Sequence, residues 1–244
     1  MAGAIIVSGL QQAATFFIAG TDTGVGKTRV TVALLAAARA ERLAVRGMKP
    51  VAAGAELHDG RMISTDAVNI AAITRQSTPY EELNPYCLLE PISPHIAADR
   101  AKIAIDKYLI AEIAGKLGQG CDLLLIEGAG GWYTPISERE SMADVARVLG
   151  CPVILVVGLR LGCLNHARLT LEAIAASDCH LAGWISNQID PCFAAIAENL
   201  ATLELLLGSK SLAHLSYAPD TADDAQQLRA ALPRLRVSRI NQNA

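Results

Sequence analysis

The sequence predicts an α/β fold, a doubly wound and mostly parallel sheet with helices on both faces. Short apolar runs alternate along the chain with longer stretches of helical length and composition. Two runs, LLLI at 123–126 and VILVV at 153–157, are continuously apolar, as expected of parallel strands covered on both faces. Because 52% of the 244 residues are hydrophobic, the chain suits one well-buried core, and we expect a single domain over 1–244.

Five strands are expected, since each run is short, apolar and followed by loop-forming residues. They span 15–19, 45–49, 122–126, 152–157 and 181–186. Helices are expected at 27–42, 66–73, 106–117, 142–149, 165–176 and 191–207, with Gly118, Gly150 and Gly208 as stops. Apart from the helix at 66–73, the Pro-, Ser- and Thr-rich residues 50–100 are expected to be a long functional or disordered loop. Residues 1–14 are expected to be an N-terminal tail or extra strand of unclear role.

The composition argues against several classes of partner. A net charge of −3 and a pI near 6.0 give no basic footprint, so we expect neither nucleic acid nor anionic lipid. No apolar run reaches the roughly 18 residues of a membrane span, and the N-terminus lacks the basic start of a secretory signal, so a cytoplasmic location is expected. The six cysteines contain no CxxC pair, which favours reduced thiols in or near the core.

The strongest chemical signal is GTDTGVGKT at 20–28, which follows an apolar strand and opens an Ala-rich helix. This is the context of a phosphate-binding loop, where backbone N–H groups at a helix N-terminus surround one anion. Lys27 is expected to add charge at the β- and γ-phosphates, and Thr28 to supply a magnesium ligand. The segment departs from the strict GxxxxGK[ST] pattern because Thr21 occupies the first glycine position, so a chance turn is the alternative.

Two carboxylates and a second lysine extend the predicted site. Glu127 follows a buried strand that delivers it to the carboxyl edge of the sheet, where ligands of such folds bind. Glu127, Asp66 and Thr28 offer the hard oxygen atoms that Mg²⁺ prefers, although Asp66 could instead cap a helix. Lys49 ends a strand beside the phosphate loop and could neutralise charge on a transferred phosphoryl group; the alternative is a surface lysine at a turn. The glycine-rich residues 128–131 suit close approach of backbone to a ligand.

Asp22 stands where one subgroup of P-loop proteins carries a second loop lysine, and GTDTxVGKT resembles the phosphate loop of the dethiobiotin synthetase family. Further segments resemble that family in order and spacing over about residues 15–190. They are KPVAxG at 49–54, Asp66, NPY at 84–86, EPxSPH at 90–95, EGAGGW at 127–132, GCxNHA at 162–167 and AGWxxN at 182–187. Two departures concern Ala53, where the family usually has a substrate-contacting serine, and Ser216, which replaces a proline.

The resemblance implies an ATP- and Mg²⁺-dependent ligase that forms dethiobiotin from 7,8-diaminopelargonate and CO₂, with Lys27 and Lys49 as catalytic residues. It also implies a homodimer with the substrate site at the interface, and an Asn187 that reads the adenine edge. The expected nucleotide and metal contacts are Gly24, Val25, Gly26, Lys27, Thr28, Arg29, Asp66, Glu127, Gly128, Ala129, Gly130, Asn187, Ser216 and Tyr217, with Thr28, Asp66 and Glu127 as the magnesium ligands. The expected substrate contacts are Thr23, Lys49, Ala53, Gly131, Cys163, Leu164 and Asn165.

Two other functions remain as alternatives. An amidoligase, such as a relative of cobyrinate diamide synthase, would also phosphorylate a carboxylate-like group, but the sequence has no appended glutaminase domain. A nucleotide-driven switch or partitioning ATPase would need no small substrate. Asp22 at the position of the second loop lysine argues against that class, and the number of agreeing segments favours the dethiobiotin synthetase family.

Overall fold

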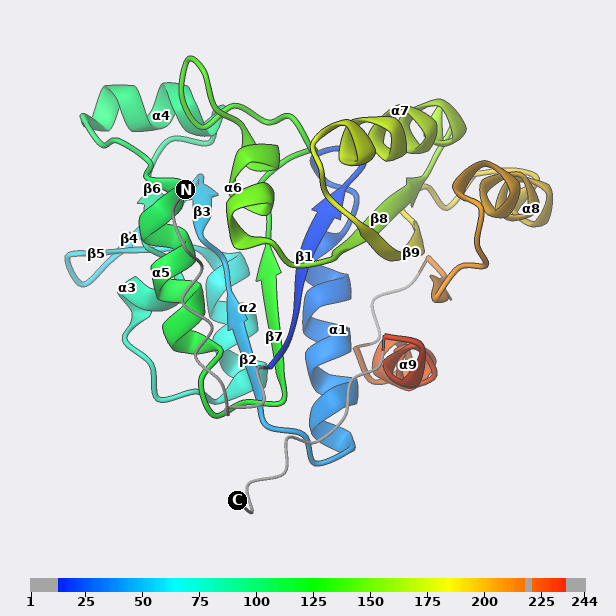
Figure 1. The fold of residues 1–244 in the computed structure, drawn as a ribbon, viewed down its shortest axis with the longest axis horizontal. Helices are drawn as coiled ribbons and strands as arrows, with labels where there is room; N and C mark the ends of the chain where they lie inside the picture. Colours follow the sequence, from blue (N-terminus) through cyan, green and yellow to red (C-terminus); the bar gives the residue numbers. More distant parts are fainter. Residues whose placement is uncertain (1–12, 218–220, 236–244) are drawn as a thin grey trace, which may run out of the picture.

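The computed structural model describes residues 13–217 and 221–235 (Figure 1). Its centre is a six-stranded sheet whose neighbouring strands all run parallel, in the order β10-β9-β8-β1-β7-β2. These strands are β1 Ala14–Gly20, β2 Val45–Met48, β7 Leu123–Glu127, β8 Val153–Leu159, β9 Leu181–Gln188 and β10 Ala213–Leu215. The predicted doubly wound parallel sheet is therefore confirmed.

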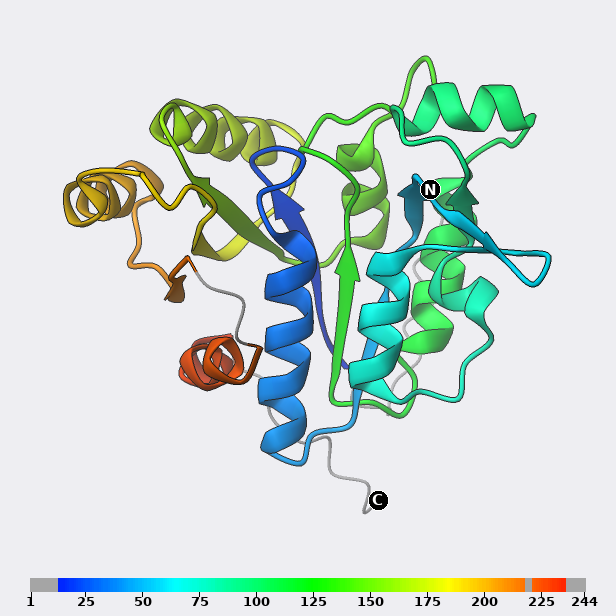
Figure 2. The same ribbon diagram turned by 180° about the vertical axis from the view of Figure 1, so that it is seen from behind.

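Helices cover both faces of the sheet, as Figures 1 and 2 show from opposite sides. One layer contains α1 Lys27–Ala40, α2 Thr65–Thr74, α9 Thr221–Arg229 and α10 Ala231–Arg234. The other contains α5 Lys107–Leu117, α6 Met142–Leu149, α7 Cys163–Ala176 and α8 Ile196–Leu207. Successive side chains of β1 supply the two cores, since Phe16 and Ile18 pack into the first layer and Phe17 and Ala19 into the second. Apolar runs without alternation are thus explained by burial on both faces.

The prediction that residues 50–100 form mainly a long loop was wrong, because much of this segment is helix or strand. Besides α2, the segment forms a parallel pair, β3 Val51–Ala53 with β6 Tyr86–Leu88, and a hairpin of β4 Glu56–His58 with β5 Arg61–Ile63. It also forms α3 Tyr80–Leu83 and α4 Pro94–Ala101. A strand of three residues is too short to show a hydrophobic period, and β3 pairs with a strand more than thirty residues further along the chain. The hydrophobic pattern therefore does not predict these strands. Ser93 followed by Pro94 was a usable helix-start signal for α4.

Smaller differences lie near the ends of the predicted elements. α7 begins at Cys163 rather than at 165, and α8 at Ile196 rather than at 191, because Ala195 takes a left-handed φ of 53° that interrupts the helical path. β10, α9 and α10 were not predicted. The expectation for residues 1–14 falls mostly outside the described residues, of which Ala14 begins β1.

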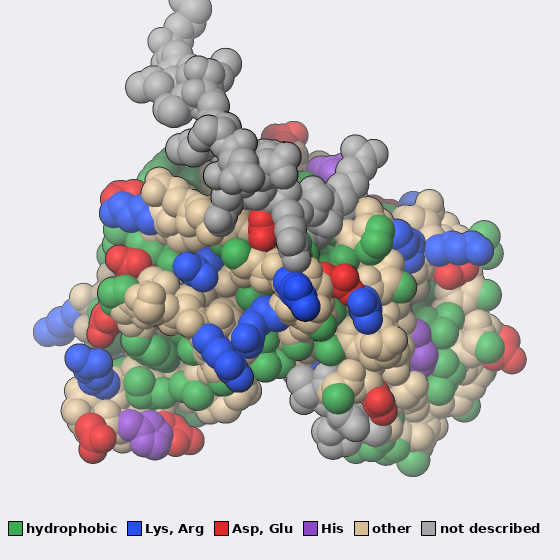
Figure 3. Space-filling model, turned by 90° about the horizontal axis from the view of Figure 1, so that it is seen from below, with side chains coloured by type: hydrophobic (Ala, Val, Ile, Leu, Met, Phe, Trp, Pro, Cys, Tyr) green, Lys and Arg blue, Asp and Glu red, His purple; other side chains and the backbone are tan. Residues whose placement is uncertain are grey.

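In Figure 1 the arrows of β1 and β7 point upward. Because all neighbouring strands of the sheet are parallel, the loops that follow β1, β2, β7, β8 and β9 lie at its carboxyl edge. The opposite, amino-terminal edge faces the viewer in Figure 3, where basic side chains are spread among hydrophobic, polar and acidic ones. Within 13–217 and 221–235, no helix has the length and apolar character needed to cross a membrane.

Close packing between β2 and α2 places Asp66 beside the sheet, and it requires glycine at position 47. A Cβ atom on Gly47 would lie 2.2 Å from Cγ2 of the fully buried Ile70. We expect Gly47→Ala to lower the free energy of unfolding by about 1–3 kcal/mol through overpacking. The matched control is Gly115→Ala in α5, where an added Cβ meets no atom within 4 Å. The higher helix propensity of alanine should raise the free energy of unfolding of this variant by about 1 kcal/mol. Urea unfolding measures both, and an unchanged or more stable Gly47→Ala protein would contradict the packing argument.

Candidate active site

The phosphate loop connects β1 to α1 and is held by a residue of β9, the strand on the far side of β8. Gly26 has a φ of 90°, and a Cβ there would lie 2.0 Å from Nδ2 of Asn187, so both conformation and space require glycine. Asn187 donates from this Nδ2 to the carbonyl oxygen of Val25 at 2.8 Å. The loop therefore reaches the N-terminus of α1 in a fixed shape, with its backbone in position to bind an anion.

Lys27 lies between the phosphate loop and the glycine-rich loop after β7. Its Nζ donates to the carbonyl oxygens of Asp22 at 3.0 Å and Gly130 at 2.5 Å. Burial, and after it the positive charge of Lys49, lowers the pKa of Lys27 to about 8. A phosphate group arriving between the two loops would meet an ammonium group that is poorly solvated and so gains strongly from an anionic partner.

Four side chains form a charge cluster at the carboxyl ends of β2 and β7: Thr28, Lys49, Asp66 and Glu127. Glu127 is fully buried, and its Oε1 lies 2.6 Å from Nζ of Lys49 and 2.7 Å from the hydroxyl oxygen of Thr28. Asp66 lies on the other side, with Oδ2 at 2.9 Å from the same Nζ and Oδ1 at 2.9 Å from the same hydroxyl. Residues from α1, β7, α2 and the end of β2 thus meet at one point.

The two carboxylates keep Lys49 charged. Burial alone would lower the pKa of Lys49, but the charges of Glu127 and Asp66 outweigh that effect and raise it. Burial would likewise raise the pKa of Asp66, yet Lys49 lowers it. The group therefore carries both negative and positive charge around neutral pH. The alternative of a surface lysine at position 49 does not hold, since the Lys49 side chain is only 6% exposed.

The same cluster offers oxygen ligands for a hard cation. The Thr28 hydroxyl has one proton, yet it faces carboxylate oxygens of both Asp66 and Glu127, so three oxygen atoms converge with one hydrogen between them. The second oxygen of Glu127, Oε2, is buried without a hydrogen-bond partner among the described residues. Two carboxylates and a hydroxyl fit Mg²⁺, which is usually held by one or two carboxylates together with substrate phosphates.

Outer hydrogen bonds hold the cluster in place, and the sequence prediction missed them. Asn84 donates from Nδ2 to the carbonyl oxygen of Lys49 at 2.6 Å, and its Oδ1 accepts from the Tyr80 hydroxyl at 3.2 Å. That hydroxyl accepts from the backbone N–H of Ser64 at 2.7 Å, at the start of the helix that carries Asp66. Tyr80 and Asn84 thus link the backbones that carry Lys49 and Asp66. The NPY segment at 84–86 was a sequence signal for Asn84, but Tyr80 had none.

The glycine-rich loop after Glu127 packs too closely for larger residues. A Cβ on Gly128 would lie 2.8 Å from Cζ of Phe17, and Gly130 has a φ of 62°. Phe17 meets the ring of Trp132 edge to face at a centroid distance of 6.2 Å. The loop is therefore fixed against the core, and its backbone passes directly beside the phosphate loop.

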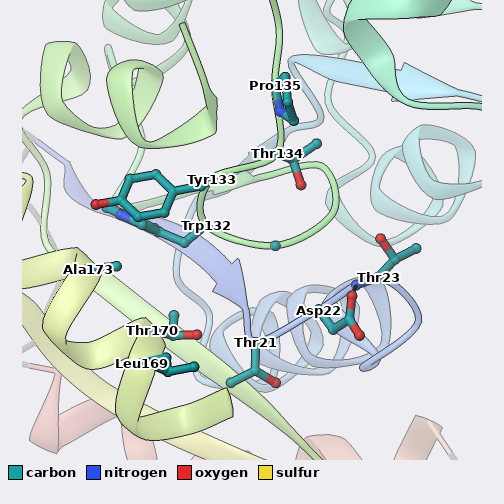
Figure 4. Close-up of a pocket in the computed structure, with 11 residues that line it drawn as sticks. Thr21, Asp22, Thr23, Trp132, Tyr133, Thr134, Pro135, Leu169, Thr170 and Ala173 are labelled. Carbon is teal, nitrogen blue, oxygen red and sulfur yellow. Dashed lines mark hydrogen bonds between the residues drawn. The ribbon is translucent and has the colours of Figure 1, made fainter. Parts of the chain in front are cut away.

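A pocket of about 590 Å³ opens beside both loops (Figure 4). It is lined by Thr21, Asp22, Thr23, Gly131, Trp132, Tyr133, Thr134, Pro135, Leu169, Thr170 and Ala173. Of the predicted substrate contacts, Thr23 and Gly131 line this pocket. Lys49 lies in the adjacent charge cluster, Ala53 ends β3, and Cys163, Leu164 and Asn165 form the first turn of α7. The residues of α7 that line the pocket, Leu169, Thr170 and Ala173, lie beyond the matched segment at 162–167, so the sequence gave no signal for them.

Asp22 connects the pocket to the loop that precedes α7. Its Oδ1 accepts from the backbone N–H of Thr23 at 2.7 Å, and its Oδ2 forms an ion pair of 2.5 Å with Arg160. Arg160 was missed in the sequence because nothing in a single chain pairs it with residue 22. The contact links the phosphate loop to the region of the predicted substrate contacts at Cys163–Asn165.

The residues predicted to contact the nucleotide base, Asn187, Ser216 and Tyr217, lie close together beside the start of α1. The Asn187 side chain has its oxygen 2.8 Å from Nη1 of Arg29, in addition to its bond to Val25. The Ser216 carbonyl oxygen accepts from Nη2 of Arg29 at 2.9 Å, and the Tyr217 N–H donates to Gln188 at 3.2 Å. The structure thus gives Asn187 a supporting role toward the loop, while reading of the adenine edge stays a prediction.

Comparison with known proteins agrees with this site. A family model described as an AAA domain matches residues 14–225. Among curated relatives, the ATP-dependent dethiobiotin synthetase BioD of Nitrosospira multiformis is 46% identical over 222 residues, covering 91% of this chain and 96% of that protein. The BioD of Aromatoleum aromaticum is 46% identical over 211 residues, covering 86% of this chain and 93% of its own.

Solved structures of similar shape are more distant in sequence. The MinC:MinD cell division complex of Aquifex aeolicus aligns with a TM-score of 0.60 at 14% identity, covering 95% of this chain and 99% of that chain. A ParA family ATPase of Chlorobium tepidum aligns with a TM-score of 0.53 at 12% identity, covering 94% and 95%. This likeness shows the fold alone, whereas the sequence relatives extend over nearly the whole chain. The chain therefore belongs to the ATP-dependent dethiobiotin synthetase BioD family.

Proposed function

We propose that the chain closes the ureido ring of dethiobiotin from 7,8-diaminopelargonate and CO₂, with conversion of ATP to ADP and phosphate, as a step of biotin biosynthesis. The observation that carries the proposal is the meeting of Lys27, Lys49, Asp66 and Glu127 at a phosphate loop, directly beside a pocket of about 590 Å³. The high identity to relatives that bear this activity in their names supports it.

The reaction has three bond-forming steps. One amine of the substrate adds to CO₂ and loses a proton, which gives a carbamate. A carbamate oxygen then attacks the γ-phosphorus and ADP leaves, and the second amine attacks the carbonyl carbon and expels phosphate. Because every nucleophile belongs to the substrate, no covalent bond to the protein is needed, and catalysis rests on positioning and charge neutralisation.

The roles of the lysines follow from their surroundings. Lys27 is aimed between the phosphate loop and Gly130, so it neutralises the β- and γ-phosphates and orients the transferred group. Lys49 stays protonated between Glu127 and Asp66, so it acts as a fixed cation for the carbamate and the developing phosphoryl charge, and not as a base. Thr28, Asp66 and Glu127 would hold Mg²⁺, which supplies further charge neutralisation at the phosphates.

The pocket walls suit a chain with polar reacting groups at one end. Thr23 and Gly131 border the phosphate loop and would meet the diamine, while Trp132, Leu169 and Ala173 offer apolar contact to its alkyl chain. Among the other predicted contacts, Cys163–Asn165 do not line this pocket. We propose that a second copy of the chain supplies them, so that a homodimer completes the substrate site.

The direct test of this function is a turnover assay with the purified chain. With ATP, Mg²⁺, bicarbonate and 7,8-diaminopelargonate we expect ADP formation that stops when any one component is omitted, and mass spectrometry should detect dethiobiotin. Lys49→Gln should lower kcat by about 100- to 1,000-fold, as removal of one preorganised charge-stabilising group typically does.

The matched control is Lys116→Gln, which removes an exposed lysine paired with Glu112 at 2.7 Å and should leave turnover at the level of the unmodified chain. ATP hydrolysis that ignores the diamine would contradict the proposal and favour a switch ATPase. Full activity of Lys49→Gln would contradict the role given to the charge cluster.

The homodimer has its own test. Tyr133, Leu161 and Leu169 lie around the pocket and the start of α7 with 57%, 94% and 56% of their surface exposed, an apolar set that a second copy would cover. We expect sedimentation velocity at assay concentrations to give a dimer, and Leu161→Glu to dissociate it and raise KM for the diamine. A chain that sediments as a monomer while turning over normally would contradict a shared site.

A further inference from the structure

One guanidinium group, that of Arg29, joins four separate parts of the chain behind the phosphate loop. Arg29 lies in the first turn of α1, directly after Thr28. Its Nε and Nη2 donate to the two carboxylate oxygens of Asp224 in α9 at 2.6 and 2.7 Å. The guanidinium group also donates to Oδ1 of Asn187 at 2.8 Å and to the carbonyl oxygen of Ser216 at 2.9 Å.

The contact to Asp224 has the geometry of a strong pair. Both carboxylate oxygens are used, and such two-point binding of a carboxylate by arginine fixes direction as well as distance. The Asp224 side chain is only 5% exposed and that of Arg29 23%, so solvent screens the pair weakly. A buried pair formed between residues 195 positions apart ties α9 firmly to the start of α1.

The bond to Asn187 carries the effect into the phosphate loop. Arg29 offers only donors, so it selects the orientation of the Asn187 amide in which Oδ1 faces the guanidinium. The Nδ2 group is then turned to the carbonyl oxygen of Val25, next to Gly26. With the amide reversed, two oxygens would face each other and the loop would lose this support.

We propose that Arg29 and Asp224 are positioning residues for the nucleotide: the pair fixes the Asn187 amide and thereby the shape of the phosphate loop. Helix α9, although it lies at the end of the chain, then contributes to nucleotide affinity without a contact of its own to the phosphates. Ser216, held by the same guanidinium, keeps the preceding segment beside the loop. The inference rests on ATP use by the proposed function, but it concerns binding alone.

The test compares two ion pairs that α9 forms at opposite ends of α1. Asp224→Asn removes the charge that holds Arg29. Arg229→Gln removes another ion pair of α9, that of Arg229 with Glu41, which lies directly after the last residue of α1, at the end of that helix remote from the phosphate loop. We expect calorimetric titration with MgATP to give a Kd roughly tenfold higher for Asp224→Asn than for the unmodified chain. This is the smaller end of the loss in affinity seen when a residue that orients a metal ligand is removed. Arg229→Gln should keep the Kd of the unmodified chain within about twofold.

Stability must be separated from positioning. Asp224→Asn should also lower Tm, so the Kd is measured on the full chain well below the Tm of each variant, where a purely structural role leaves the Kd of the folded protein unchanged. If Asp224→Asn does not fold, Arg29→Lys replaces it, since lysine keeps the charge but cannot reach Asp224 and Asn187 with the same fork. A Kd within twofold of the unmodified chain for the folded variant, or an equal loss in Arg229→Gln, would overturn the proposal. Because no diamine is present, failure to form dethiobiotin would not affect this outcome.

Discussion

The site depends on one buried ion pair, that between Lys49 and Glu127. Glu127 is fully buried at the end of β7, where an unpaired carboxylate would be strongly unfavourable, and Lys49 makes it tolerable at a distance of 2.6 Å. Neighbouring parallel strands, β2 and β7, deliver both residues to the same edge of the sheet. A buried ion pair contributes little net stability to folding, and the position of this one beside the phosphate loop supports the catalytic role proposed for Lys49.

Around that pair, the fold brings distant residues together by connecting each strand end to a different layer. α1 supplies Thr28 and Lys27 from one side, α2 supplies Asp66, and the loop after β7 closes over Lys27 through Gly130. The phosphate loop in turn is supported from β9. Apart from Gly130, these groups lie on or directly beside a helix or strand, which keeps their charges fixed relative to one another.

Much of this arrangement could be predicted from sequence, because its parts have local signatures. The continuous apolar strands, the glycine-rich loop before Lys27 and the acid that ends β7 each follow from a short pattern with a physical cause. The contacts that depend on long-range pairing could not be predicted. Nothing local in a single sequence connects Arg160 to Asp22 or Asp224 to Arg29, and the three-residue strands β3 and β6 stabilise each other only after the chain has folded.

The central claim of this account is that the charge cluster promotes transfer of the γ-phosphoryl group to a carbamate oxygen. The most direct measurement starts the reaction with ¹⁸O-labelled CO₂, quenches it before the label exchanges with water, and determines the isotope content of the released phosphate by mass spectrometry. The account predicts one labelled oxygen in each phosphate formed together with dethiobiotin, because the carbamate oxygen that attacks phosphorus leaves with it. Unlabelled phosphate accompanying dethiobiotin would show that the phosphoryl group goes to another acceptor and would contradict the claim.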